Sequence, residues 1–133
     1  MNFKSLSSLN IRDNAIGVNF ENSTIIPPWF SNLTSFMNLD HGQNNFDHST
    51  NVFEKLSSLR VLDISSNGFG DSLLSSLNKL NNLVYLDLLG NDIHYSNLHL
   101  LGNLTSVSVL KLRYSELKRL VPEALTSISF EYS

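Results

Sequence analysis

The chain repeats one spacing of hydrophobic residues along most of its length. Five segments follow the order apolar, two variable positions, apolar, one variable position, apolar. They begin at Leu6, Phe36, Leu59, Leu83 and Val107. Asparagine usually follows three residues later, as in LRVLDISSNGF and LVYLDLLGNDI. His41 and Ser115 depart from the pattern. Because several columns of residues recur together, the pattern indicates an array of repeated structural units.

The spacing of the segment starts divides nearly the whole chain into units. Successive starts lie 30, 23, 24 and 24 residues apart. We therefore expect a single array over residues 1–133, with no separate domain or linker. Its five units are 6–35, 36–58, 59–82, 83–106 and 107–130, and a sixth unit would begin near Glu131. The first unit is about six residues longer, and the extra stretch at 17–25 is expected to form a surface loop.

The spacing L-x-x-L-x-L-x-x-N is that of the leucine-rich repeat. Alternation along its short strand places Leu62 and Ile64 inward and Asp63 outward. One unit cannot cover its own apolar face, so neighbouring units must stack. The sequence thus predicts an α/β fold, a leucine-rich-repeat right-handed solenoid of about five repeats. Its parallel sheet lies on the concave face, and short 3₁₀ or irregular segments lie on the convex side.

The composition fits this fold, with 24 Leu, 21 Ser and 17 Asn among 133 residues. Leucine fills a stacked core, whereas the inward turn after each strand leaves backbone N–H and C=O groups to satisfy. Such groups cost about 1–3 kcal/mol each when they are buried without a partner. An asparagine amide offers both donors and an acceptor. We predict a structural asparagine ladder formed by Asn14, Asn44, Asn67 and Asn91.

The repeats resemble the plant-type extracellular leucine-rich repeat. The stretch IPPWFSNLTS at 26–35 is similar to plant receptor-like proteins, the group that contains the fungal-xylanase receptors and the Cf-type resistance proteins. This resemblance covers about residues 3–130. It implies recognition of a protein or peptide ligand on the extracellular face of the plasma membrane, in defence or developmental signalling. It also implies a co-receptor kinase as a partner. The chain has none of the flanking cysteine caps, the signal peptide, the transmembrane helix or the kinase domain of whole receptors, so we interpret it as an ectodomain fragment.

Candidate ligand-binding residues fall on the predicted concave face. Acidic residues recur once per unit there, and they are accompanied by arginine and tyrosine, which are enriched at the energetic centres of protein interfaces. The candidates are Asp40, Arg60, Asp63, Tyr85, Asp87, Lys111, Arg113 and Tyr114. Two interpretations of the acidic column stay open. It is a solvated strand face, or it contacts a basic ligand or co-receptor.

Three Asn-x-Ser/Thr sequons, at Asn22, Asn32 and Asn103, are candidate glycosylation sites. Chance occurrence in a chain rich in Asn and Ser is the alternative explanation. Two of these sequons, at Asn32 and Asn103, occupy the same position in their units. This position lies off the concave strand, so a glycan there would leave the binding surface open.

Other kinds of chemistry have little support. The net charge of −3 gives no reason to expect nucleic acid, and no apolar run approaches the ~20 residues of a membrane span. There is no cysteine, and the four histidines lack metal-ligand spacing. We expect no enzyme, no cofactor and no metal. Three alternatives to a receptor stay open: an intracellular adaptor, a soluble enzyme inhibitor, and a non-functional truncated remnant.

Overall fold

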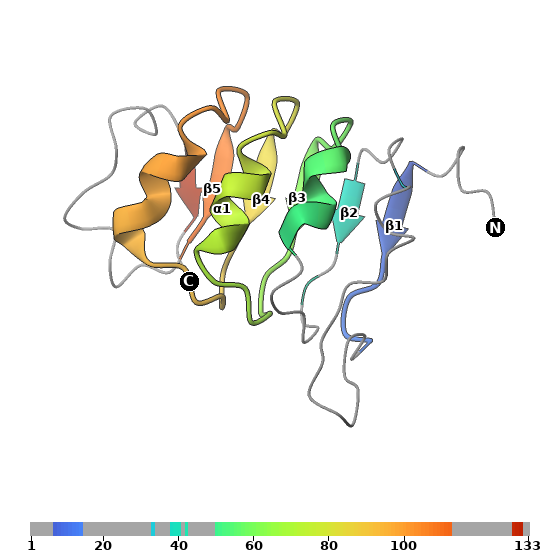
Figure 1. The fold of residues 1–133 in the computed structure, drawn as a ribbon. Helices are drawn as coiled ribbons and strands as arrows, with labels where there is room; N and C mark the ends of the chain where they lie inside the picture. Colours follow the sequence, from blue (N-terminus) through green and yellow to red (C-terminus); the bar gives the residue numbers. More distant parts are fainter. Residues whose placement is uncertain are drawn as a thin grey trace.

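A computed structural model of the chain describes residues 7–14, 33, 38–40, 42, 50–112 and 129–131. Within these residues six short strands form one sheet (Figure 1). The order of the strands in the sheet is their order along the chain, and every neighbouring pair is parallel. The strands are β1 (Ser8–Asn10), β2 (Asn38–Asp40), β3 (Val61–Asp63), β4 (Tyr85–Asp87), β5 (Val109–Lys111) and β6 (Ser129–Glu131).

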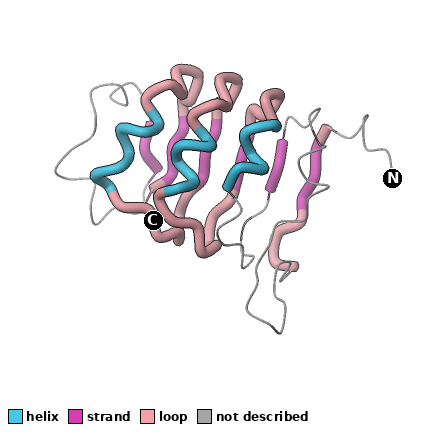
Figure 2. Tube along the Cα trace, viewed as in Figure 1, coloured by secondary structure: helices cyan, strands magenta, loops and turns pink. Residues whose placement is uncertain are grey.

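Short helical segments form a second layer beside the sheet (Figure 2). They are the 3₁₀ helices η2 (Thr50–Lys55) and η3 (Tyr95–Leu101) and the six-residue α-helix α1 (Ser72–Leu77). The helix α1 packs against both η2 and η3. From β2 to β5 each turn of the chain therefore runs from a strand to a helical segment and back to the next strand. The predicted right-handed solenoid, with a parallel sheet and short convex segments, is confirmed.

Columns of leucine that recur every 24 residues fill the space between the two layers. The strands contribute Leu62, Leu86 and Leu110, and each of these residues is at most 1% exposed. The turns before the strands repeat one hydrogen bond, whose donor–acceptor distance is 2.9 Å in each unit. These bonds run from the N–H of Leu56, Leu80 and Leu104 to the carbonyl oxygens of Phe53, Leu77 and Leu101. Burial of one such side chain stabilises the fold by about 1.5–3 kcal/mol, so the stacked leucines dominate the stability.

The last strand comes earlier than the sequence predicts. The strands β3, β4 and β5 begin at residues 61, 85 and 109, whereas β6 begins at residue 129. Its register pairs Ser129 with Val109 and Phe130 with Leu110. The expectation that the next unit begins near Glu131 is therefore wrong, and the predicted last unit, 107–130, ends inside this strand. The hydrophobic pattern missed β6 because the position equivalent to Val107 is Ser127, which is polar.

Some sequence predictions fall outside the described residues. They are the surface loop at 17–25 and the departures from the pattern at His41 and Ser115. In the part of the chain that is described, no helix is long and apolar enough to cross a membrane.

Candidate recognition surface

Outward-facing strand positions form two rows across the sheet. The register places Tyr85 between Val61 and Val109 in the first row, and it places Asp87 between Asp63 and Lys111 in the second. Neighbouring strands lie ~4.8 Å apart, so one ligand can contact several members of a row. Val61 is 36% exposed. Tyr85 and Val109 are half-buried. The first row is therefore largely apolar and partly accessible, and the second row is charged.

The carboxylate of Asp87 is buried although it faces outward. The residue is only 6% exposed, and the side chains of Tyr85 and Lys111 lie next to its carboxylate. The Tyr85 hydroxyl donates to Asp87 Oδ2 (3.3 Å), and Lys111 Nζ lies 3.9 Å from the same oxygen. Lys111 Nζ also lies 5.4 Å from the centre of the Tyr85 ring, within cation–π range. The interpretation of the acidic column as a solvated face is therefore wrong for Asp87.

Burial raises the pKa values of both Asp87 and Tyr85. It raises the pKa of the Asp87 carboxyl, and this effect outweighs the lowering by the Leu89 N–H and by Lys111. Burial likewise raises the pKa of the Tyr85 phenol, with a smaller opposing contribution from Lys111. Tyr85 is therefore a neutral hydrogen-bond donor at neutral pH.

The second row also has a structural function. In three units the side-chain oxygen at the end of the strand accepts the backbone N–H two residues later, and it thereby satisfies a donor in the turn. These bonds join Asn10 Oδ1 to Arg12 N (3.0 Å), Asp63 Oδ1 to Ser65 N (2.9 Å) and Asp87 Oδ1 to Leu89 N (3.1 Å). Sequence reasoning treated this column as a question of charge alone, although the same side-chain oxygens shape the turns.

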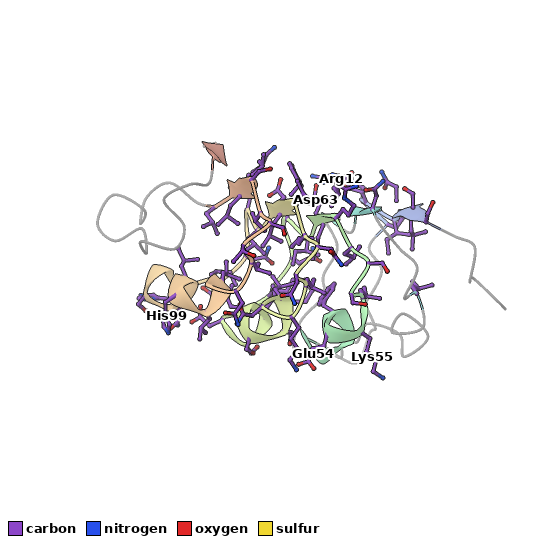
Figure 3. The ribbon with its side chains drawn as sticks, turned by 90° about the horizontal axis from the view of Figure 1, so that it is seen from above. Arg12, Glu54, Lys55, Asp63 and His99 are labelled. Carbon is purple, nitrogen blue, oxygen red and sulfur yellow. The ribbon has the colours of Figure 1, made fainter. Side chains whose placement is uncertain are left out.

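Arg12, which was not among the sequence candidates, contributes to this surface. From the turn after β1 its Nη1 donates to Asp63 Oδ2 (2.5 Å), and its Nη2 lies 3.4 Å from Ser65 Oγ. Figure 3 shows Arg12 and Asp63 together on the sheet side of the molecule. The guanidinium crosses the second unit at Gly42, where an added Cβ would lie 2.5 Å from Nη1. A glycine in the same column as Arg12 and Ser65 was the signal in the sequence that could have revealed this contact.

An open groove lies beside the carboxyl ends of β3 and β4. We call it the edge groove. It is lined by Arg12, by Asp87 and by the turns at 65–67 and 89–92, and its volume is about 670 Å³. Most of its lining is polar, so it differs in character from the apolar first row.

The predicted ladder asparagines that the structure describes donate to the turn backbones. Asn67 Nδ2 donates to the carbonyl oxygens of Ile64 and Ser65, both at 3.0 Å. Asn91 joins two units, because its Nδ2 donates to Leu88 O (3.1 Å) and to Ile64 O (2.9 Å). Its Oδ1 also accepts the N–H of Phe69 (3.1 Å) in the preceding unit. In the first unit, Asn14 Nδ2 donates to Arg12 O (2.7 Å), and Asn44 lies outside the described residues.

The remaining candidates are spread over the molecule. Arg60 is exposed just before β3, at the opposite end of that strand from Asp63. Asp40 ends β2, in register with Asp63. Asn103 is exposed after η3, and its N–H donates to Asn78 Oδ1 (2.9 Å). Four candidates lie outside the described residues: Arg113, Tyr114, Asn22 and Asn32.

The histidines that the structure describes, His94 and His99, are exposed. Figure 3 places His99 on the helical layer, away from the sheet. Among the described residues, no group of three or more His, Cys, Asp or Glu could hold a metal ion.

Two sequence profiles, both described as leucine-rich repeat, match residues 5–33 and 55–77. These matches agree with the stacked units and the inward leucine columns of the structure. The chain belongs to the leucine-rich-repeat proteins. Modules of this family generally recognise other molecules and are generally not enzymes.

This leucine-rich-repeat chain is related to plant receptor-like proteins. It is 33% identical to Receptor-like protein 39 of Arabidopsis thaliana and 34% identical to Receptor-like protein 41 of the same plant. Each alignment is 107 residues long, and it covers 78% of this chain and 12% of the relative. The chain therefore spans about an eighth of the length of these relatives.

Two solved structures share the leucine-rich-repeat fold. An internalin from Listeria monocytogenes is 25% identical, with a TM-score of 0.63 over 76% of this chain and 29% of that chain. The ectodomain of the Arabidopsis receptor kinase HAESA, solved in complex with an extended IDA peptide hormone, is 24% identical. Its TM-score is also 0.63, over 81% of this chain and 19% of that chain.

Proposed function

We propose that this chain is a recognition module for a protein or peptide ligand within a plant cell-surface receptor-like protein. Its role would be defence or developmental signalling, with a co-receptor kinase carrying the signal across the membrane. The relationship to two Arabidopsis receptor-like proteins supports the cellular setting. The proposal needs no catalytic residue, because binding alone transmits the information.

The apolar first row carries the proposal of a binding surface. Val61, Tyr85 and Val109 stand side by side on adjacent strands that the buried leucine columns hold in place. Tyrosine and partly exposed apolar side chains on a rigid sheet lose little conformational entropy when a ligand binds. A ligand seated there also reaches the charged row at Asp63 and Lys111, which adds specificity.

Peptide display against the purified full chain tests this surface. Peptides selected on the wild-type protein are measured against Val61→Glu and against Ser75→Glu, a control on the exposed face of α1. Both variants add one negative charge at an exposed position. We expect Val61→Glu to weaken binding about tenfold or more, the loss typical of a residue at the centre of an interface. The control should bind as wild type does.

The opposite pattern of binding losses would contradict recognition by the first row. Peptides that bind Val61→Glu normally but lose affinity for Ser75→Glu would place recognition on the helical layer. Thermal unfolding of both variants confirms that each retains the stacked core.

The proposed cell-surface setting has a separate test at Asn103. The residue is exposed, so an oligosaccharyltransferase in the secretory pathway can reach its sequon. We expect mass spectrometry of the native plant product to find a glycan on Asn103, and Thr105→Ala to abolish it. Unmodified Asn103 in a cytosolic fraction would favour an intracellular adaptor instead.

A further inference from the structure

The turn after β3 places a glycine directly behind a ladder asparagine. Asn67 is the only one of the 17 asparagines in the chain that glycine follows. The backbone nitrogen that follows an asparagine can attack the carbon of its side-chain amide, and a glycine has no side chain to hinder the approach. Asn91, the equivalent residue of the next unit, is followed by Asp92. The sequence therefore favours this reaction at Asn67 over every other asparagine.

The attacking nitrogen is available at Asn67 and occupied at Asn91. Gly68 is exposed, and within the part of the chain that is described its N–H takes part in no hydrogen bond. At the equivalent position of the next unit, the N–H of Asp92 donates to Phe69 O (2.9 Å). A nitrogen that already donates must lose that bond before it can react. Two asparagines with the same structural role thus differ in the state of the neighbouring nucleophile.

The side chain of Asn67 reacts only when the turn opens locally. Its Nδ2 donates to Ile64 O and Ser65 O, both at 3.0 Å, and these bonds hold the amide toward the preceding residues. Ser66, directly before it, has a φ of 50°, a conformation that is unfavourable for an L-residue. Opening the turn releases this strain, which lowers the cost of the exposed state from which the amide reacts.

We propose that Asn67 is a site of spontaneous deamidation, a covalent modification in which Gly68 supplies the nucleophile. Solvent takes the proton of the Gly68 N–H, the nitrogen bonds to Asn67 Cγ, and the Cγ–Nδ2 bond breaks. The leaving nitrogen takes a proton from solvent and departs as ammonia. One water then opens the resulting succinimide at either carbonyl, which gives aspartate or isoaspartate. Overall one water is consumed and one ammonia is released.

Either product weakens the turn and its contact with the next unit. A carboxylate has acceptors only, so it cannot donate to Ile64 O or Ser65 O and instead repels both oxygens. Isoaspartate also adds one carbon to the main chain, two residues before Phe69. Phe69 is fully buried, and its N–H donates to Asn91 Oδ1 (3.1 Å). The modification therefore loosens the array at one defined turn, whether or not the proposed recognition function is correct.

Peptide mapping of the purified full chain tests the site. The protein is incubated at mildly alkaline pH, and mass spectrometry follows the conversion of each asparagine to aspartate or isoaspartate. We expect Asn67 to react about tenfold faster than Asn91 or more, a difference of about 1.4 kcal/mol in the barrier. A protein isoaspartyl methyltransferase, which labels isoaspartate alone, should label the peptide that contains Asn67. Equal rates at Asn67 and Asn91 would overturn the proposal.

A matched pair of variants tests whether Gly68 is the nucleophile. Gly68→Ala adds a methyl group beside the attacking nitrogen and should slow the reaction about tenfold. Gly70→Ala in the same turn leaves this nitrogen unchanged, and its Cβ would lie 4.0 Å from Asp92 O, so the rate should stay that of wild type. Gly90 alone among the described glycines has a positive φ, so alanine fits the backbone at both positions. An unchanged rate in Gly68→Ala, or equal slowing by Gly70→Ala, would overturn the assignment.

A second pair of variants measures the consequence for the fold. Asn67→Asp reproduces the aspartate product and should raise the unfolding equilibrium constant in urea about tenfold or more, because the two carbonyl oxygens lose a donor. Asn81→Asp makes the same chemical change at an exposed position and should leave the constant nearly unchanged. Equal effects of the two substitutions would contradict a loosened turn.

Discussion

One residue in each described turn adopts a left-handed backbone conformation. The φ angles are 58° at Asp13, 50° at Ser66 and 68° at Gly90, and these residues occupy the same position in their units. For an L-residue this conformation costs about 1–2 kcal/mol, and glycine largely escapes the cost. The turn after the strand is therefore strained at Asp13 and Ser66 and relaxed at Gly90.

Ser66→Gly should stabilise the protein. Glycine removes the cost of the positive φ but loses more entropy on folding, which leaves a net gain of about 0.5–1 kcal/mol. The free energy of unfolding in urea measures it. Ser75→Gly in the exposed face of α1 is the control, and it should destabilise the protein by about 0.5 kcal/mol. A loss of stability in Ser66→Gly would show that the serine hydroxyl matters more than the backbone strain.

Asp87→Asn should increase stability at neutral pH. The pKa of Asp87 is raised in the folded state by burial, so the native protein binds more protons than the unfolded chain between the two pKa values. The stability contributed by Asp87 is therefore fully present below its unfolded pKa and falls as the pH rises through the folded pKa. Asparagine stays neutral and can still accept the Leu89 N–H.

The advantage of Asp87→Asn over wild type should disappear below the ordinary carboxyl pKa of 3.8, where both proteins are neutral at this position. Urea unfolding of the two proteins at pH 7 and at pH 3 measures the difference. If wild type gained stability over the variant as the pH rose, the attraction of Lys111 would outweigh the burial of the charge.

Among the elements, the sequence predicted the strands better than the contacts between them. The apolar pair around Asp63 marks β3, because alternation is a local property of the strand. The burial of Asp87 depends on Tyr85 and on a lysine one unit further along, and no local pattern contains that information. The contact of Arg12 with Asp63 spans two units, so it requires the stacking geometry before it can be recognised.

The contact between Arg12 and Asp63 predicts that substitutions at Arg12 and Gly42 have coupled effects on stability. In Gly42→Ala the new Cβ would meet Arg12 Nη1 at 2.5 Å and Cζ at 2.9 Å, so the guanidinium must leave Asp63. We expect a loss of about 1.5–3 kcal/mol, the contribution of a hydrogen bond between charged groups. In an Arg12→Gln background the same alanine should cost clearly less, because the guanidinium contacts are gone and only the contact of the Cβ with Ser65 Oγ at 2.9 Å remains.

A double-mutant cycle of Gly42→Ala and Arg12→Gln, measured by urea unfolding, tests this coupling. Additive effects would mean that the alanine acts on some contact other than the guanidinium. The cycle thus distinguishes a bridge that crosses β2 from a local packing requirement at Gly42.

At the scale of the whole molecule, the stability of stacked repeats is approximately the sum of the intrinsic stabilities of the units and of the interfaces between neighbouring units. The backbone bonds between units repeat, as in Ile64 N to Asp87 O (3.1 Å) and Leu88 N to Lys111 O (3.0 Å). Polar side chains add further links, such as Asn82 Nδ2 to Ser57 O (2.9 Å). Removing a side chain that bonds across an interface should therefore lower the free energy of unfolding more than removing one of the same type that bonds within its own turn.

Asparagine at the ladder position offers this comparison. Asn91→Ala removes the side-chain partners of Phe69 N in the preceding unit and of Leu88 O in its own, and it removes one of the two asparagine donors of Ile64 O. The loss should be about 2–4 kcal/mol, since unsatisfied buried groups cost about 1–3 kcal/mol each. Asn14→Ala removes an exposed bond to Arg12 O and should cost about 0.5–1 kcal/mol. Urea unfolding followed by circular dichroism measures both, and equal losses would mean that the ladder contributes within units and does not join them.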